Sequence, residues 1–162
     1  MGDIRKSSER LRRLVTVLFV GLASLIVLER FGWVAVPIVR HTLSRSAWVH
    51  LADEVVGACP EVLFLLSLWG VRAALQRLAQ GDLYGAVMVR MLKRVGAMVA
   101  AGSFLKVFVE PAAHRWLGYA PGYWIAYDVS GVVLGVVGLA LIIVARVLEN
   151  AAELKAELDG IF

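Results

Sequence analysis

Six ionisable residues interrupt or border long apolar stretches of the sequence: Glu29, Arg30, Glu61, Lys106, Glu110 and Asp128. Charge in hydrocarbon is costly, so such a side chain usually faces the interior of a helix bundle or a watery cavity. These acids and bases could line one small outward-facing pocket for a cation, a proton or a cationic ligand. Mutual salt bridging that locks the helices together is the simpler alternative, and the sequence favours it.

The spacing of these residues suggests which of them meet. Lys106 and Glu110 lie four residues apart, so they share one face of a helix. We expect Glu61 and Lys106 to form the contact between helices, and Glu29–Arg30 to lie at the membrane interface. The side chains expected to contact a ligand or ion are Glu61, Lys106, Glu110, Asp128 and Arg30.

The histidines offer a weaker candidate for chemistry. His41, His50 and His114 fall in expected outer loops, whereas bis-histidine haem ligation needs side chains that project inward from facing helices. A metal site that combines them with Asp53 or Glu54 is conceivable. Solvated loop side chains are the favoured interpretation, so we expect no metal and no other cofactor.

Catalytic chemistry finds little support in the remaining residues. Cys59 is the only cysteine, which excludes an intrachain disulfide and a CxxC redox pair. No nucleophile, base and orienting group stand in a recognisable constellation. The sequence therefore predicts a protein that is not an enzyme.

The elements that must position the charged residues are membrane helices. Hydrophobic residues make up 60% of the chain, against about 45–50% in soluble domains, and the mean hydropathy is +0.76. A soluble body of 162 residues cannot bury that much apolar surface. Four stretches approach the roughly 20 residues that a spanning helix needs, at about 14–36, 55–75, 86–109 and 125–147. We predict an all-α integral membrane four-helix bundle that forms a single transmembrane domain over residues 1–162.

Prolines and glycines suggest where these spans end. Pro37 and Pro111 are expected to end the first and third spans, and Pro60 lies in the first turns of the second. Residues 38–54 could form a short interfacial helix or an ordinary loop, and the sequence does not separate the two. Gly81-Asp82 is expected to join the second and third spans as a helix end followed by an N-cap.

Basic residues predict the orientation. The N-terminus, the 72–94 junction and the C-terminus carry 12 of the 17 lysines and arginines, so both termini should be cytoplasmic in a bacterial inner membrane. The net charge of +4 then reflects topology, and we expect no direct nucleic acid binding. Aromatic residues expected at the outer interface agree with this orientation: Trp33, Trp48, Trp116, Tyr119, Tyr123, Trp124 and Tyr127.

The C-terminal residues 148–162 read as a cytoplasmic amphipathic helix. An apolar seam with 4-3-4-3 spacing runs through Val147, Ala151, Leu154, Leu158 and Ile161, as in a helix that packs on another helix. Acidic residues border this seam, which suits a basic protein partner better than anionic lipid. Folding back onto the 72–94 junction is an equal alternative. The residues expected to bind the partner are Leu154, Leu158, Ile161, Arg77, Lys93 and Arg94.

A glycine stripe marks the last span. Gly131-x-x-x-Gly135 with Gly138 is the small-xxx-small pattern that lets helices approach closely. Packing within the chain is the favoured interpretation, and homo-oligomerisation is the alternative.

Two segments resemble the DUF2975 family of small four-span bacterial membrane proteins: residues 78–96, and the last span running into a charged helix. Members carry a Gly-acidic pair and then a Leu-basic-basic-apolar-Gly element, here Gly81-Asp82 and Leu92-Lys93-Arg94-Val95-Gly96. Where the family often has an aromatic residue and Ser or Thr, this chain has Tyr84-Gly85. The biochemical activity of this family is unknown. Many members are encoded beside a small helix-turn-helix regulator, so the resemblance implies that this chain could be the membrane partner of such a regulator.

Together these features predict a non-enzymatic multi-pass membrane protein that tethers a small DNA-binding regulator at its cytoplasmic face. The outer charged layer would then sense the signal. The alternative is a small oligomeric transporter or channel subunit that uses the charged layer in the outer half of the bundle.

Overall fold

The structure, a computed structural model, describes residues 2–32, 45–79, 86–118, 125 and 128–159, and the side chains of 9–32, 48–76, 87–118, 125 and 128–154. The regular elements in these ranges are helices. α1 (Gly2–Ile26) continues into a π-helical turn, η1 (Val27–Phe31). α3 (Arg45–Ala79) follows. α4 (Ala86–Phe104) runs through a second π-helical turn, η2 (Leu105–Val109), into α5 (Glu110–Trp116), and α6 (Val129–Asp159) is the last helix.

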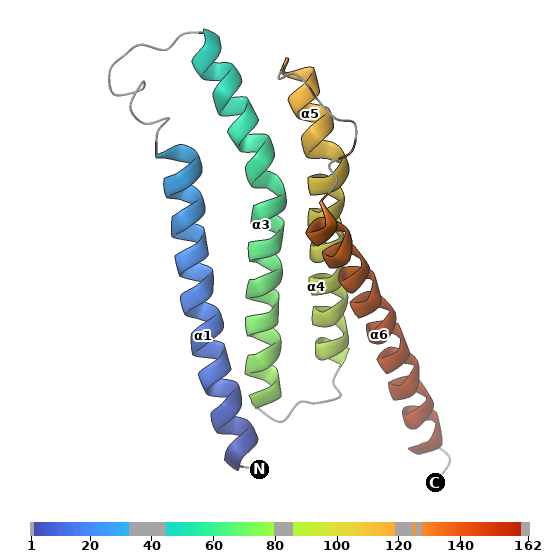
Figure 1. Cartoon of the computed structure of the whole chain (residues 1–162). Coiled ribbons are helices and arrows are strands. Elements are labelled where there is room, and N and C mark those ends of the chain that lie inside the picture. The colour runs from blue at the N-terminus through green and yellow to red at the C-terminus, as the bar shows by residue number, and fades with distance from the viewer. Residues whose placement is uncertain (1, 33–44, 80–85, 119–124, 126–127, 160–162) are drawn as a thin grey trace.

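Four helical stretches are long and apolar enough to cross a membrane: Glu9–Phe31, Trp48–Gln76, Val87–Trp116 and Val129–Leu154. The prediction of four spans is thereby confirmed, and the chain is a multi-pass membrane protein. The long helices alternate in direction, so the start of α1 and the end of α6 lie at the same end of the molecule (Figure 1).

The helices pack in a row, because the extensive contacts within the described residues join successive helices. α1 packs on α3, α3 on α4, and α4 on α6 (Figure 1). The predicted bundle is therefore arranged as a series and not as a closed ring. Within the described residues, each outer helix packs mainly on one neighbour, α1 on α3 and α6 on α4, and turns most of its circumference outward.

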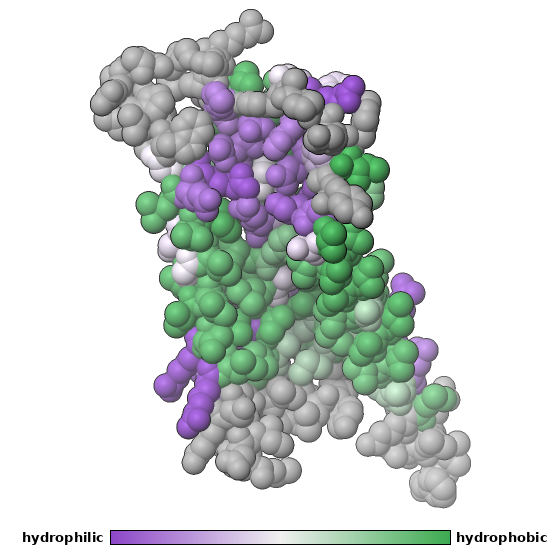
Figure 2. Space-filling model, viewed as in Figure 1, coloured by the Kyte–Doolittle hydropathy of each residue, from purple (hydrophilic) through white to green (hydrophobic). Residues whose placement is uncertain are grey.

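The side chains buried between the helices are few and mostly small, such as Val95, Val99 and Ala145. The accessible surface is 11436 Å², against roughly 8,000 Å² expected for a soluble protein of this mass. Much of the outward surface is apolar and forms a broad green band in Figure 2. Hydrocarbon is the solvent that such a surface fits.

The glycine stripe of α6 is used inside the chain. A Cβ atom on Gly138 would lie 2.6 Å from the backbone nitrogen of Ala100 and 2.7 Å from the carbonyl oxygen of Gly96. Gly131 and Gly135 face Val107 and Ser103 in the same interface. Packing within the chain, the favoured interpretation of this stripe, is therefore confirmed, and α4 covers the glycines.

Two predicted boundaries are wrong. Residues 45–54 are neither a separate interfacial helix nor a loop, but the first turns of α3. Pro111 does not end the third span, because it lies in the first turn of α5. A proline is tolerated there, since the N–H that it lacks has no partner at the start of a helix. Pro37, Gly81 and Asp82 lie outside the described residues.

Candidate functional site

The first charged contact joins η1, at the end of the first span, to α3 through Arg30. Its Nη2 and Nε donate to the two carboxylate oxygens of Glu61, at 2.5 and 2.9 Å, and its Nη1 donates to Glu54 at 3.1 Å. The pair with Glu61 is bidentate, the strongest geometry for arginine and carboxylate. All three side chains are about three-quarters buried. One cation therefore holds two carboxylates of the neighbouring helix.

Gly57 provides the space for this contact. Glu54, Gly57 and Glu61 are spaced three and four residues apart, so they share one face of α3. A Cβ atom on Gly57 would come within 2.5 Å of Arg30 Nη1. Arg30 thus lies across the glycine, between the two glutamates, and a larger residue would displace it.

A second group of charges joins α3 to η2 and α5. His114 Nε2 lies 3.2 Å from Asp53 Oδ1, and Lys106 Nζ lies 3.6 Å from Glu110 Oε2 one turn away. Asp53 Oδ1 and Glu110 Oε2 are buried and receive no hydrogen bond from the described residues. Together with the Arg30 contacts, these side chains form what we call the charged layer: Arg30, Asp53, Glu54, Glu61, Lys106, Glu110 and His114. Figure 2 shows polar residues gathered above the apolar band.

The arginine and the lysine of the charged layer both lie in π-helical turns. Arg30 is part of η1 and Lys106 is part of η2. A π-helical turn holds one residue more than an α-helical turn, and it occurs frequently at functional sites. The extra residue rotates every later side chain about the helix axis. Counting 3.6 residues per turn along the sequence therefore assigns the residues after such a turn to the wrong face of the helix.

Asp128 has a different role from the one expected. Its Oδ1 accepts a hydrogen bond of 3.0 Å from the backbone nitrogen of Ser130, and its carbonyl oxygen accepts one from Val132. These are the contacts of a residue that caps the start of α6. Asp128 is thus part of the helix start, and no ion pair joins it to the charged layer in the described part of the chain.

Two predictions about these residues are wrong. Glu61 pairs with Arg30 and not with Lys106, whose partner is Glu110. The placement of Glu29–Arg30 at the membrane interface stays a prediction; Arg30 faces α3 and Glu29 is exposed. His50 and His114 lie in helices and not in loops, while His41 falls outside the described residues.

Asp53, Glu54 and Gly57 were missed as parts of this site. The sequence does indicate that Glu54 and Gly57 share a helix face with Glu61, because these residues are three and four positions apart. The second span is expected to begin at residue 55, and this boundary leaves Asp53 and Glu54 outside the predicted helix. Within the described residues no group of three or more metal-ligating side chains is placed to hold a metal ion.

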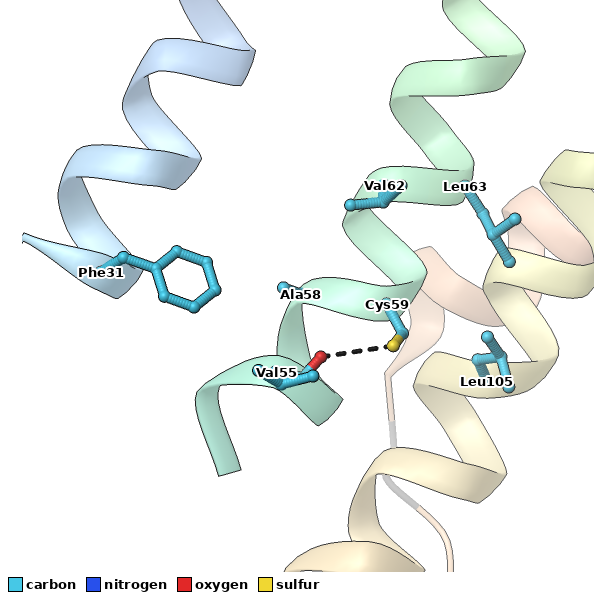
Figure 3. Close-up of a pocket in the computed structure, with 7 residues that line it drawn as sticks. All are labelled: Phe31, Val55, Ala58, Cys59, Val62, Leu63 and Leu105. Atoms are coloured by element: carbon cyan, nitrogen blue, oxygen red, sulfur yellow. Dashed lines mark hydrogen bonds between the residues drawn. The ribbon is translucent and has the colours of Figure 1, made fainter. Parts of the chain in front are cut away.

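An apolar groove lies beside the charged layer on another face of α3 (Figure 3). Its volume is about 420 Å³, and Phe31 from η1 and Leu105 from η2 lie on its two sides. The free thiol of Cys59 opens into it and donates to the carbonyl of Val55 at 3.3 Å. This lining can hold hydrocarbon and offers no polar group for orienting a reactive substrate.

The opposite end of the molecule carries the α6 extension, which we define as Val147–Asp159. Lys93 Nζ lies 2.5 Å from Glu149 Oε2 and fastens the start of the extension to α4. The last turns then continue past the beginning of α4 (Figure 1). This ion pair is a contact between the 72–94 junction and the start of the extension, and it is the part of the fold-back alternative that the described side chains show.

Among the described seam residues, Val147 and Leu154 are 60% and 61% exposed, and Ala151 is exposed as well. Arg94 is also exposed. The side chains of Arg77, Leu158 and Ile161 lie outside the described side chains. The seam predicted from the sequence is therefore uncovered over its described part.

Comparison with protein-family models matches residues 40–161 to the family described as a protein of unknown function, DUF2975. The matched region includes α3, the third span and α6, and it begins after Arg30. Neither curated proteins nor solved structures gave a match.

Proposed function

The chain belongs to the DUF2975 family, and on that premise we propose that it is a non-catalytic membrane tether for a small soluble regulator. The observation that carries the proposal is the α6 extension, in which the helix continues past the uncharged stretch 129–145, gains charged residues from Arg146 onward and exposes an apolar seam. Such a seam is stable in water when another helix packs on it.

Charge favours a basic partner. Glu149 and Glu153 border the described part of the seam, and Glu157 and Asp159 follow in the sequence. Acidic residues repel the anionic surface of a membrane and attract a basic protein. A helix-turn-helix protein has the basic surface that DNA binding requires. The resemblance noted from the sequence names the same class of partner.

The charge distribution favours a cytoplasmic position for this end. Its described side chains are mainly basic: Arg10, Arg12, Arg13, Arg72, Arg90, Lys93, Arg94 and Arg146, against Glu9, Glu149 and Glu153. The other end is mainly acidic, with Glu29, Asp53, Glu54, Glu61, Glu110 and Asp128 against Arg30, Lys106 and Arg115. By the rule that lysine and arginine stay inside, both termini are cytoplasmic in a bacterial inner membrane.

The experiment that tests the tether uses the full chain, extracted in mild detergent from its native membrane. We expect a small helix-turn-helix protein to copurify with the full chain and to be lost when the chain ends after Glu149. Leu154→Arg should abolish its recovery. Ala152→Arg, which adds the same charge on the opposite face of α6, is the matched control. Equal recovery with Leu154→Arg and Ala152→Arg refutes docking on the seam.

A second candidate, a small oligomeric transporter or channel subunit, is favoured by one observation. Acids exceed bases in the charged layer, and two of its buried carboxylate oxygens receive no hydrogen bond from the described residues. A cation could occupy such a layer. Cation flux into vesicles that is lost in Glu61→Gln and in Lys106→Met would support this candidate. Unchanged flux in both variants would exclude it.

A further inference from the structure

Arg72 is held in a fixed position between α1 and α3. Its Nε donates to the hydroxyl of Thr16 on α1 at 2.9 Å, and its guanidinium carbon lies 4.5 Å from the centre of the Trp69 ring. Thr16 in turn donates to the carbonyl of Arg12 at 2.8 Å. A hydrogen bond on one side and an aromatic face on the other remove much of the freedom of the arginine side chain.

The charge of Arg72 has no counter-ion from the described part of the chain. No carboxylate pairs with it there, and its hydrogen bond and its ring contact both come from uncharged groups. Arg12 lies one helical turn before Thr16, and Arg13 directly follows Arg12 in the sequence. Glu9, the acidic residue of this part of α1, is not free. Within the described residues, the guanidinium of Arg72 thus lies at one end of the α1–α3 interface without an ion-pair partner.

The depth of these arginines matches a lipid headgroup. The uncharged stretch of α1 begins at Leu14, directly after Arg12 and Arg13, and Arg72 is the first charged residue after the uncharged stretch 62–71 of α3. Arg12 and Arg72 therefore border the apolar parts of both helices. Toward the middle of the membrane the same interface is apolar, with the rings of Phe19 and Trp69 5.1 Å apart. A ligand here meets cations at the surface and hydrocarbon beneath.

We propose that Arg72 binds the phosphate of an anionic phospholipid between α1 and α3, with Arg12 one helical turn before Thr16 adding positive charge on α1. The guanidinium offers paired N–H groups to a phosphate, and stacking on Trp69 leaves those groups free to turn outward. The acyl chains then run along the outward faces of Phe19 and Trp69. A phospholipid supplies both parts in one molecule, whereas free phosphate supplies only the first. This inference does not depend on the docking of a soluble partner.

The test uses the full chain in zwitterionic detergent, with dioleoyl phosphatidylglycerol or dioleoyl phosphatidylcholine added to the micelles. Native mass spectrometry counts the bound lipids, and thermal unfolding reports their effect on stability. Phosphatidylglycerol should stay bound and raise Tm, while phosphatidylcholine should do neither. Arg72→Met should weaken phosphatidylglycerol binding about tenfold, the loss expected for one charge-assisted hydrogen bond.

Arg146→Met is the matched control, because Arg146 is an exposed arginine at the same end of the molecule but on α6. Wild-type lipid binding in Arg72→Met, or an equal loss in Arg146→Met, overturns the proposal. So does an equal rise of Tm with phosphatidylcholine or with inorganic phosphate. If Arg72→Met does not fold, Thr16→Val decides. It keeps the charge of Arg72 but removes its hydrogen bond, so binding should weaken, and unchanged binding contradicts the proposal.

Discussion

The guanidinium of Arg30 lies so close to the backbone of Gly57 that a single added Cβ atom would come within 2.5 Å of Nη1. The position of Arg30 in η1 thus depends on the absence of a side chain at Gly57 in α3. This relationship joins the first span to the second at the charged layer. It also suggests a stability experiment at Gly57, in which the helix propensity gained with alanine opposes the loss of the Arg30 contacts.

Gly57→Ala should destabilise the protein, although alanine favours a helix over glycine by about 1 kcal/mol. The methyl group displaces Arg30 from Glu54 and Glu61, which loses more than the helix gains. Gly21→Ala is the control, because no atom lies within 4 Å of a Cβ built on Gly21, and it should be neutral or stabilising. Unfolding in mixed micelles of increasing denaturing detergent measures both variants. Equal stabilisation of the two variants contradicts the close contact.

The Arg30–Glu61 pair should couple more strongly than the Lys106–Glu110 pair. The first is bidentate and joins two helices, while the second spans 3.6 Å within one helical stretch. A double-mutant cycle with Arg30→Met and Glu61→Gln should give a coupling on the order of 1–2 kcal/mol. The cycle with Lys106→Met and Glu110→Gln should give about 0.3–0.5 kcal/mol. The reverse order would mean that Arg30 is not the central cation of the layer.

Gly138→Ala should separate α4 from α6. The atoms nearest to the new methyl group are backbone atoms of Ala100 and Gly96, which cannot turn aside as a side chain can. We expect a loss of about 1–3 kcal/mol in unfolding free energy, as for overpacking in other interiors. Gly135→Ala is the matched control in the same stripe, because its nearest neighbour is the side chain of Ser103 at 3.3 Å. A smaller cost at Gly135 than at Gly138 is the expected result, and equal costs would speak against backbone contact.

Labelling of single cysteines tests the proposed orientation. In a Cys59→Ala background, Trp116→Cys and Ala151→Cys place a thiol on exposed positions at opposite ends of the molecule. A maleimide that cannot cross membranes should label Trp116→Cys in intact cells and should label Ala151→Cys only after lysis. The opposite pattern would reverse the orientation and remove the cytoplasmic partner from consideration.

Much of the fold followed from composition and length. The four apolar stretches, the helical class and the internal use of the glycine stripe in α6 were all predictable, because hydrocarbon requires helices of a certain length and close packing requires small residues. The ends of the helices were less predictable. Pro111 predicts the end of a helix, yet the sequence does not reveal the π-helical turn η2, after which α5 begins with this proline in its first turn.

The charged layer was predictable as a set of residue types at one end of the molecule, and its pairs were not. Counting along regular helices leads from Glu61 to Lys106, because both belong to adjacent spans. Arg30 reaches Glu61 instead, since η1 rotates the end of the first span and Gly57 leaves room for the guanidinium.

The sequence by itself determined that this chain spans a membrane four times, because the cost of burying or exposing apolar surface depends on composition alone. It also determined which residues carry charge near hydrocarbon. Only the tertiary structure decided that α1 contacts α3 and that the helices form a row. It likewise decided that Arg30 is paired with two glutamates, while Arg72 has no carboxylate partner within the described residues. The physical reason is that pairing depends on distances between side chains of different helices, and π-helical turns and single glycines change those distances.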